Sequence, residues 1–281
     1  MPETVREALA QATRRLGAAG IDSPHVDARI LAAHFLGCAP LEVFVHASQP
    51  VPEGFAEAVA RRERREPLQW ITGSAAFGPL ELAVGPGVFI PRPETEVLAD
   101  WAVRTLQASG TSSPVVVDLC AGCAAMALFI AHELPDASVH AVELSESAVE
   151  WARRNVGALG LNVELHEADA TDPGLLAQLA GKVDLVVANP PYVPDAAPVA
   201  PEVDFDPSLA IFGGPDGLGI VRGIVGTAGR LVRPGGWFGF EHDDAAAEPA
   251  LEILAASGLF GNVRSLRDLA GIERFTLGAR L

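Results

Sequence analysis

Val183-Asp184-Leu185-Val186-Val187-Ala188, followed at once by Asn189-Pro190-Pro191-Tyr192, is the stretch of this chain of 281 residues that decides its fold. The first six residues are almost all apolar, as is typical of a strand buried in a parallel sheet. The four that follow would then lie at the carboxyl end of this strand, where open α/β sheets bind their ligands. The stretch therefore predicts an α/β fold with a site at that edge of the sheet.

The residues of this turn suit the recognition of a planar nitrogen, such as an amide or the exocyclic amine of a base. The side-chain oxygen of Asn189 and the main-chain carbonyl of Pro190 can both accept hydrogen bonds from an NH2 group, and a proline has no amide hydrogen to donate. Tyr192 can stack on the plane of that group. A plainer interpretation is that Asn189 caps a turn in which the two prolines only end a strand.

A second strand-and-turn pattern upstream indicates a nucleotide site and so favours the functional interpretation. Val115–Leu119 is an apolar run that contains Asp118, and it precedes a tight loop over residues 120–124 and a helical pattern. About twenty residues further on, Val139–Glu143 is another apolar run that ends in an acid, the position that can take ribose hydroxyls. Strand, loop, helix and acid at this spacing predict a doubly wound sheet.

Further motifs lie at intervals along almost the whole chain. In order, they are Glu66–Gly73 (EPLQWITG) with Phe77, Val88–Glu96 (VFIPRPETE), Gly213–Leu218 (GGPDGL), Pro234–Gly236 (PGG) and Asp268–Gly271 (DLAG). With these motifs and its Asn-Pro-Pro-Tyr turn, the chain resembles the PrmC/HemK family of protein-glutamine methyltransferases. The resemblance implies a Rossmann-like class I methyltransferase sheet, S-adenosylmethionine as cofactor, and the glutamine in the Gly-Gly-Gln loop of a peptide chain release factor as methyl acceptor.

The resemblance also implies roles for individual residues. The cofactor site would comprise Asp118, Cys120, Ala121, Gly122 and Ala124 around the methionine part, Glu143 at the ribose, Asp169 and Ala170 beside the adenine, and Asn189. The substrate site would comprise Phe77, Arg92, Asn189, Pro190, Pro191 and Tyr192, of which Asn189, Pro190 and Tyr192 would be catalytic. Plainer interpretations are that Asp118 and Asp169 cap turns, Glu143 is a solvated strand end, Phe77 belongs to the core, and Arg92 pairs with Glu94 or Glu96.

The cofactor loop departs from the family pattern of three alternate glycines. Cys120 and Ala124 replace the first and third glycine, and only Gly122 remains. Because glycine allows a positive φ and close approach of the backbone, we expect these side chains to weaken cofactor binding without abolishing it. Cys120 and Cys123 lie at a helix N-terminus, which favours thiolates and would allow a redox switch, although two small residues that fill the loop are the plainer interpretation.

The charge and the composition exclude some functions. With 36 acidic and 20 basic residues the net charge is −16, which opposes binding to a phosphate backbone and argues against direct contact with nucleic acid. The basic cluster at residues 61–65 (RRERR) is either a solvated helix face or a docking patch for the partner. The three cysteines are too few for a disulfide framework, and His132 and His140 lie on separate predicted elements, so no metal site is indicated.

Periodicity divides the chain into a helical domain (residues 1–68), a β-hairpin linker (69–91) and an α/β domain (92–281). The resemblance implies that the first docks the substrate and that the last is the methyltransferase domain. Within the last, Val263–Leu266 and Arg274–Leu277 are expected to pair antiparallel at the sheet edge. No apolar run reaches the roughly 20 residues needed to span a bilayer, and the first residues (MPET) lack a signal pattern. We therefore expect a cytoplasmic protein that has no membrane partner. We also expect a monomer, although the acidic surface fits a dimer equally well.

Direct transfer of the methyl group is the mechanism that these residues favour, because an amide nitrogen is a poor nucleophile that must be oriented rather than deprotonated beforehand. Two alternatives remain open. One is an enzyme of the same fold that is redirected to another amine or amide, such as a small metabolite. The other is a non-catalytic binding protein that has lost the cofactor because of its altered loop.

Overall fold

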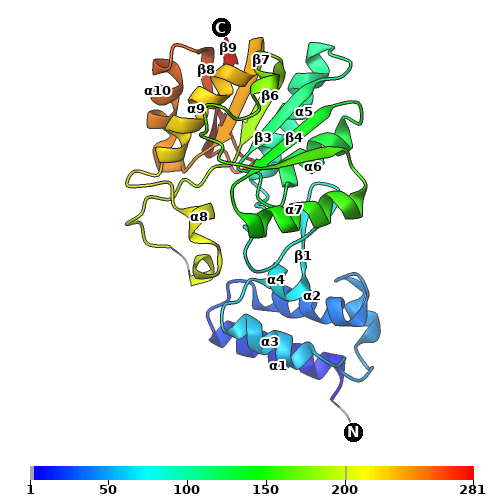
Figure 1. The fold of residues 1–281 in the computed structure, drawn as a ribbon. Helices are drawn as coiled ribbons and strands as arrows, with labels where there is room; N and C mark the ends of the chain where they lie inside the picture. The colour runs from blue at the N-terminus through cyan, green and yellow to red at the C-terminus, as the bar shows by residue number, and fades with distance from the viewer. Residues whose placement is uncertain (1–2, 200) are drawn as a thin grey trace. The chain divides into compact units, whose positions relative to one another are not determined.

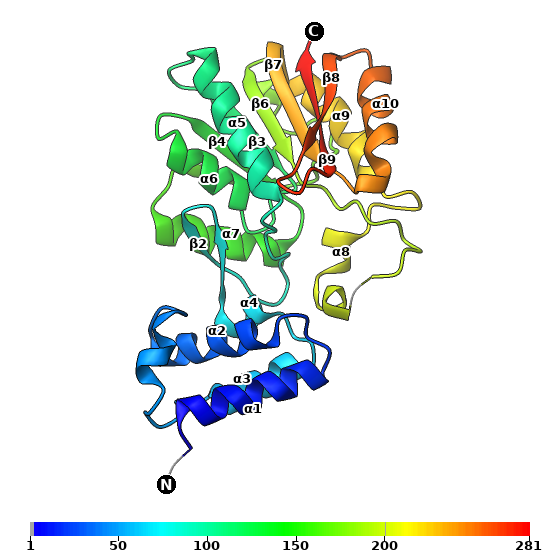
Figure 2. The ribbon, with the colours of Figure 1, turned by 180° about the vertical axis from the view of Figure 1, so that it is seen from behind.

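The computed structural model describes residues 3–199 and 201–281, which form two compact units. The first unit comprises the residues up to 74 together with 199–205, and the second comprises residues 75–198 and 206–281. The prediction that the first residues (MPET) carry no signal pattern concerns in part Met1 and Pro2, which lie outside the described residues. Figures 1 and 2 show the units from opposite sides.

The first unit is helical. Its elements are α1 (Val5–Ala18), α2 (Pro24–Leu36), η1 (Glu42–His46), α3 (Phe55–Glu63), α4 (Leu68–Thr72) and η3 (Pro201–Phe205). Thr4 begins α1 with a capping box, in which the Glu7 amide donates to the Thr4 hydroxyl and the Thr4 amide donates to the Glu7 carboxylate at 2.9 Å. The apolar faces of the helices meet in one buried cluster around Leu16, Leu31 and Phe55.

The arginines at residues 61–65 are largely engaged within this unit. Arg62 is buried and donates to Asp27 at 2.8 Å. Arg62 and Arg65 also pair with Glu202, at 3.5 and 2.7 Å, which ties the segment that contains Glu202 to the helical unit. The cluster is therefore neither a simple solvated face nor a free basic patch, because buried guanidinium groups require such partners.

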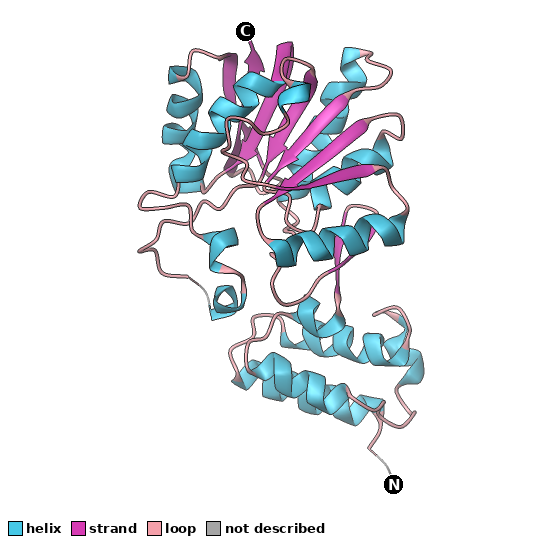
Figure 3. Ribbon diagram, in the orientation of Figure 1, coloured by secondary structure: helices cyan, strands magenta, loops and turns pink. Residues whose placement is uncertain are grey.

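The second unit is an α/β sheet with helices on both faces (Figures 1 and 3). Its strands are β1 (Ser74–Phe77), β2 (Leu80–Ala83), β3 (Val115–Leu119), β4 (Ser138–Glu143), β5 (Val163–Glu167), β6 (Val183–Ala188), β7 (Val232–Glu241), β8 (Phe260–Arg267) and β9 (Glu273–Arg280). Its helices are α5 (Thr95–Ser109), α6 (Ala125–Glu133), α7 (Glu146–Leu159), η2 (Ala177–Leu179), α8 (Ser208–Ile211), α9 (Gly219–Leu231), η4 (Asp244–Ala246) and α10 (Ala247–Ala256).

The strand order of the main sheet, within the described residues, is β5-β4-β3-β6-β7-β9-β8. The first five of these strands pair in parallel, whereas β9 pairs antiparallel with both β7 and β8. The predicted antiparallel pair at the sheet edge is confirmed, with β9 inserted between β7 and β8. The order reverses between β3 and β6, so their carboxyl ends form the crevice where doubly wound sheets bind ligands.

The register aligns the ends of the three strands that border this crevice. Leu119 of β3 pairs with Ala188 of β6, and Ala188 pairs with Phe240 of β7. The next residue of each strand therefore lies in the same row, and these residues are Cys120, Asn189 and Glu241. The cofactor loop and the Asn-Pro-Pro-Tyr turn are neighbours for this reason.

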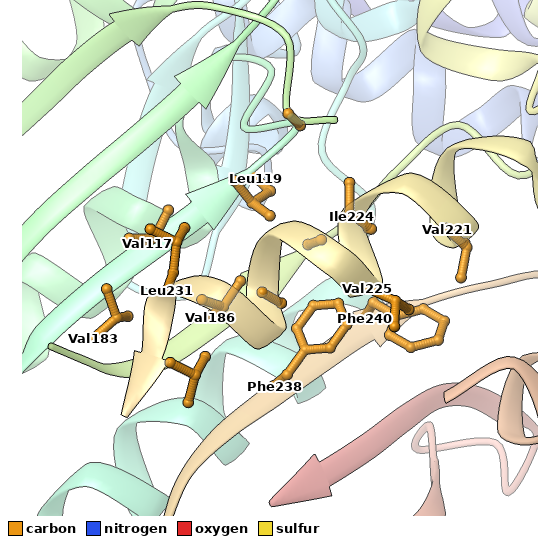
Figure 4. Close-up of a cluster of buried hydrophobic side chains, with 14 of the residues drawn as sticks. Val117, Leu119, Val183, Val186, Val221, Ile224, Val225, Leu231, Phe238 and Phe240 are labelled. Carbon is orange, nitrogen blue, oxygen red and sulfur yellow. The ribbon is translucent and has the colours of Figure 1, made fainter. Parts of the chain in front are cut away.

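A core cluster fills the face of the sheet on which α9 lies (Figure 4). Ile224 of α9 belongs to this cluster with Phe238 and Phe240 of β7, whose rings stack with their centroids 5.2 Å apart. A side chain at Gly239, between them, would meet Trp101 of α5. Because successive strand residues point to opposite faces, β7 is buried between α9 and α5.

The hairpin of β1 and β2 begins only after a short helix. The expected linker starts at residue 69, whereas α4 occupies residues 68–72 and ends at Gly73, whose φ is +78°. Pro67 precedes this helix, a position where a missing amide hydrogen removes no helical hydrogen bond. In the part of the chain that the structure describes, no helix is long and apolar enough to cross a membrane.

Candidate active site

The loop after β3 places three alternate residues in the left-handed region of the backbone. Their φ values are +60° for Cys120, +57° for Gly122 and +66° for Ala124. A residue with a Cβ costs about 1–2 kcal/mol in this region, which is why glycines suit all three positions. The chain therefore keeps the backbone of a glycine-rich loop at two positions where it carries side chains.

Gly122 lies at the centre of this loop and faces open space. A Cβ built on it would have no atom of the described residues within 4 Å. Its amide donates to Glu143 Oε2 at 2.8 Å, and the Ser145 amide donates to Glu143 Oε1 at 2.8 Å. Each carboxylate oxygen can accept a second hydrogen bond, so Glu143 can receive hydroxyl groups while it holds the loop.

Asp118 is fully buried in β3, two residues before the loop begins to turn. Its Oδ2 accepts from the Ala127 amide at 3.0 Å, whereas its Oδ1 has no hydrogen-bond partner in the described part of the chain. Burial raises the pKa of Asp118 to about 8; the Ala127 amide opposes this rise and Glu143 adds to it. An unpaired buried carboxylate oxygen suits a cationic group of a ligand, because such a group would offset the unfavourable burial.

Asp169 and Ala170 follow β5, at the carboxyl end of the sheet. Asp169 is exposed, and its Oδ1 accepts from the amide and from the hydroxyl of Thr171, both at 2.7 Å. Ala170 is buried in the core cluster of the α9 face. The Asp169 turn fixes the position of the carboxylate, which is compatible both with turn capping and with an adenine contact.

The two cysteines of the cofactor loop have raised thiol pKa values. Burial, followed by the nearby carboxylates, raises the pKa of Cys120 above its usual range, and burial raises the pKa of Cys123 to about 12. The expectation that the helix N-terminus favours thiolates here is therefore wrong, because the low dielectric and the acids outweigh the field of the helix. Both cysteines are free, and they fill the loop as small side chains.

A chain of hydrogen bonds holds the Asn-Pro-Pro-Tyr turn. Asn189 Nδ2 donates to Thr95 Oγ1 at 3.2 Å, and Thr95 Oγ1 donates to Glu241 Oε2 at 2.7 Å. The Tyr192 hydroxyl donates to Glu241 Oε1 at 3.0 Å. An ionised carboxylate only accepts, so the Thr95 hydroxyl must donate to it and can only accept from Asn189. The amide of Asn189 thus turns Nδ2 toward Thr95, which leaves Oδ1 as an acceptor for a ligand.

The protonation states of this chain depend on Glu241, which is 2% exposed. Burial raises the pKa of Glu241 to about 7, although the hydrogen bonds from Thr95 and Tyr192 lower it. Burial and the Glu241 carboxylate raise the pKa of Tyr192 above its usual range, so the phenol keeps the proton that it donates.

Thr95 and Glu241 are the residues of this site that the sequence did not single out. Thr95 lies within the motif at residues 91–96 (PRPETE), and Glu241 is an acid at the end of an apolar strand. An acid at or near the end of an apolar run is also the pattern that pointed to Asp118 and Glu143. The same pattern could have pointed to Glu241. Only the register of β6 and β7 shows that it lies beside Asn189.

Arg92 pairs with Asp206. The guanidinium lies 3.4 Å from Asp206 Oδ2 and over the ring of Phe89, 5.0 Å from its centroid. Asp206 is buried, and burial raises its pKa to about 6 while Arg92 lowers it. Arg92 also lowers the pKa of Tyr192, which places it near the turn.

Phe77 does not present a surface to a ligand, contrary to the expectation that it walls the substrate pocket. It is fully buried in β1, with its ring edge-on to Phe129 of α6 at 5.9 Å between centroids. The next residue, Gly78, has no side chain, and the Phe129 ring occupies the space that a Cβ at this position would need. Burial against apolar neighbours is the favourable position for such a ring, so the core interpretation holds.

The segment Gly213–Leu218 packs against the backbone of the turn. A Cβ at Gly213 would collide with the carbonyl of Pro191, and a Cβ at Gly217 would collide with the carbonyl of Tyr192. The amide of Gly213 donates to the carbonyl of Val193 at 2.9 Å. Two glycines of this motif are therefore needed so that the segment can approach and support the turn.

A mixed sheet of five parallel strands and an antiparallel pair, with a left-handed loop after β3, an acid at the end of β4 and an Asn-Pro-Pro-Tyr turn after β6, defines a methyltransferase of the Rossmann-like class I fold. Solved structures share this fold. The hMettl16 catalytic domain has a TM-score of 0.57 at 18% identity, over 80% of this chain and 81% of its own. A T. thermophilus 16S rRNA methyltransferase in complex with AdoMet and guanosine has a TM-score of 0.54 at 23% identity, over 74% of this chain and 50% of its own.

The chain belongs to the release factor glutamine methyltransferase (PrmC) family. A family model described as the PrmC N-terminal domain matches residues 7–73, and one described as the methyltransferase small domain matches residues 82–201. A release factor glutamine methyltransferase from Corynebacterium glutamicum is 49% identical over 99% of both chains. A 4-amino-L-phenylalanine/4-methylamino-L-phenylalanine methyltransferase from Streptomyces pristinaespiralis is 41% identical over 93% of this chain and 91% of its own.

Proposed function

We propose that this protein transfers a methyl group from S-adenosylmethionine to the side-chain amide nitrogen of the glutamine in the Gly-Gly-Gln motif of a peptide chain release factor. The observation that carries this proposal is the orientation of Asn189, whose Oδ1 is kept as an acceptor by the hydrogen bonds through Thr95 and Glu241. The name of the 49% identical relative supports the release factor as substrate.

The cofactor loop fits S-adenosylmethionine at three points. Gly122 faces open space that a ligand can approach, Glu143 retains lone pairs for ribose hydroxyls, and Asp118 Oδ1 can receive the ammonium group of the methionine part. We place Cys120, Ala121 and Ala124 around the methionine part, and Asp169 and Ala170 beside the adenine. When bound, the cofactor supplies a methyl group on a positively charged sulfur.

The residues of the turn orient the acceptor nitrogen. Its lone pair is delocalised into the amide, so its position and direction limit the reaction. Asn189 Oδ1 and the Pro190 carbonyl accept the two hydrogens of the NH2 group, and these bonds strengthen as positive charge builds on the nitrogen. The Tyr192 ring, fixed by its hydroxyl on Glu241, stacks on the amide plane. The extra proton leaves to water after transfer.

We assign the wall of the substrate pocket to Arg92 and Pro191, and the docking of the release factor to the helical domain that the sequence predicts at residues 1–68, which lies within the helical unit. Within this unit, the segment around η1 exposes three large apolar side chains to solvent: Leu41, Phe44 and Val45. Such a patch suits contact with a protein, and the net charge of −16 opposes contact with nucleic acid. We place the reaction in the cytoplasm, where release factors act, and expect a monomer without a membrane partner.

A second candidate is methylation of the aryl amine of a small amino acid. The relative from Streptomyces pristinaespiralis, which is 41% identical, carries such an activity in its name. Asn189 and Pro190 would accept hydrogen bonds from an aryl NH2 as readily as from an amide, so the turn alone does not separate the two substrates.

The experiment that separates them offers three acceptors to the purified enzyme with methyl-labelled S-adenosylmethionine. The acceptors are a release factor, the same factor with its Gly-Gly-Gln glutamine replaced by alanine, and 4-amino-L-phenylalanine. The proposal predicts label in the first alone. Label in the free amino acid alone would establish the second candidate, and no label together with no measurable cofactor binding would indicate a non-catalytic binding protein.

A further inference from the structure

Three side chains with metal-ligating atoms come together on β4 and β5, at the edge of the sheet. The register pairs His140 with Glu164 across the two strands. His166 lies two residues further along β5, so its side chain projects from the same face. The parallel register therefore gathers two imidazoles and one carboxylate that are far apart in the sequence.

The ligand atoms of these residues lie close together. His140 Nδ1 is 3.1 Å from His166 Nε2 and 3.3 Å from Glu164 Oε2, and His166 Nε2 is 3.7 Å from Glu164 Oε1. Around a tetrahedral Zn²⁺ with bonds of about 2.0–2.1 Å, neighbouring ligand atoms are about 3.3 Å apart. These separations, of which the two to Glu164 are measured to different oxygens, bracket this value. The imidazole planes are 25° apart, so an ion binds once the rings turn to point both lone pairs at it.

We propose that His140, Glu164 and His166 form a binding site for a divalent transition-metal ion of the Zn²⁺ class. Two imidazoles and a carboxylate are a ligand set that Zn²⁺ accepts, with a water molecule in the fourth position. Mg²⁺ and Ca²⁺ prefer sites made of oxygen atoms, so the two nitrogens select against them.

The surroundings of His140 hold it in the orientation that the site needs. Its Nε2 lies 3.3 Å from Ser138 Oγ, which turns Nδ1 toward the other two ligands. A partner on the second ring nitrogen is the usual support of a metal-bound imidazole. His140 is 7% exposed whereas Glu164 is exposed, so the ion enters from the solvent side onto a fixed ligand.

The contact between the two imidazoles is a hydrogen bond when no metal is bound. One ring then carries the proton that lies between His140 Nδ1 and His166 Nε2. When the ion binds, this proton moves to the other nitrogen of the same ring, and both rings direct a lone pair at the metal. The ion replaces one proton in the contact, and both imidazoles stay neutral.

The position of the site indicates what the ion does. β5 is the edge strand of the main sheet, and it pairs only with β4 in the described part of the chain. A metal ion bound by His140 of β4 and by two residues of β5 links the edge strand to its neighbour. Metal binding should therefore raise the thermal stability of the protein and slow hydrogen exchange in β5.

Isothermal titration of the full chain with Zn²⁺, with Mg²⁺ as the comparison ion, tests the proposal. The variants are His166→Gln and Glu164→Gln, which alter side chains at the accessible side of the cluster. His132→Gln is the matched control, because His132 also lies at the surface beside a carboxylate, 3.9 Å from Glu133, but belongs to no such cluster of ligands among the described residues. Circular dichroism of each variant checks that it folds.

We expect one Zn²⁺ per wild-type chain, no Mg²⁺, and a rise in Tm with Zn²⁺. His166→Gln should weaken Zn²⁺ binding at least tenfold and remove the rise in Tm, whereas His132→Gln should leave both unchanged. Equal Zn²⁺ affinity in wild type and His166→Gln would overturn the proposal, as would an equal loss in His132→Gln.

Discussion

The substitution Gly122→Ala separates the strain of the cofactor loop from its contact with the cofactor. The φ of Gly122 is +57°, and no described atom lies within 4 Å of the methyl group that alanine would add. The left-handed conformation costs alanine about 1–2 kcal/mol, and the stiffer unfolded chain returns about 0.4–1 kcal/mol. The free energy of unfolding should therefore fall by only about 1 kcal/mol, because the methyl group meets nothing within the protein.

Cofactor affinity should fall much further, because the methyl group occupies the space through which the cofactor approaches the backbone. We expect the Kd for S-adenosylmethionine, measured by titration calorimetry, to rise at least about tenfold, which is 1.4 kcal/mol or more. Gly160→Ala is the matched control: this glycine ends α7 at a φ of +64° and also has no described atom within reach of a Cβ. It should lose the same stability and bind the cofactor normally.

Two results would refute this reasoning. If Gly122→Ala bound S-adenosylmethionine with wild-type affinity while losing about 1 kcal/mol of stability, the loop would not be the surface that the cofactor contacts. If Gly160→Ala weakened cofactor binding as much as Gly122→Ala does, the effect would arise from general destabilisation.

Four further predictions concern the turn and the loop. Thr95→Val leaves Asn189 Nδ2 without its acceptor, which costs about 1–3 kcal/mol and should lower kcat about tenfold. Thr95→Ser keeps the hydroxyl and should keep most of the activity. Equal kcat values for the two variants would contradict the hydrogen-bond chain. Because Glu241 must be ionised to fix this chain, and burial raises its pKa to about 7, kcat should rise as the pH rises through 7, and Glu241→Gln should remove that step from the pH profile. Because the pKa of Glu241 is raised by folding, its contribution to stability is present below about pH 4.5 and is lost as the pH rises through about 7. Urea unfolding of the wild type and of Glu241→Gln at several pH values measures this loss. Replacing both Cys120 and Ala124 by glycine should tighten cofactor binding. The free energy of unfolding should change by less than about 1 kcal/mol, because relief of the left-handed strain offsets the lost burial and the looser unfolded chain. Unchanged cofactor affinity would show that these side chains do not narrow the cofactor site.

Much of the fold could be predicted because its strands are short and strongly apolar. Val115–Leu119 and Val183–Ala188 have the bounds in the structure that their apolar runs predict. The doubly wound arrangement was also predicted, since a strand, a loop, a helix and an acid follow one another at the spacing of such a sheet. The exact place of β9 could not be predicted, because the local sequence pattern does not specify which of two antiparallel strands lies at the edge of a sheet.

The site could be predicted where its chemistry is local in the sequence. Asn189 to Tyr192 are consecutive, and their hydrogen-bonding groups can be listed from the residue types alone. The part played by Thr95 and Glu241 could not be predicted in this way. These residues are 146 positions apart, and only the folded sheet brings the hydroxyl to the carboxylate.

Electrostatic expectations failed where burial decides the outcome. A helix N-terminus favours a thiolate in general, but burial and then the nearby acids raise the pKa of both the Cys120 and the Cys123 thiol. The ion pairs of Arg62 with Asp27 and Glu202 changed the interpretation of a basic cluster for a similar reason. A sequence gives the charges, but the fold gives their partners.

The central claim is that Asn189 orients the glutamine amide for methylation. The most direct test is transfer of labelled methyl from S-adenosylmethionine to a purified release factor by the wild type and by Asn189→Ala, with the modified residue mapped by peptide mass spectrometry and cofactor affinity measured for both. The account predicts label on the glutamine of the Gly-Gly-Gln motif, loss of that label in Asn189→Ala, and cofactor binding in the variant that falls much less than transfer. Label on that glutamine at the wild-type rate in Asn189→Ala, or label on another residue, would contradict it.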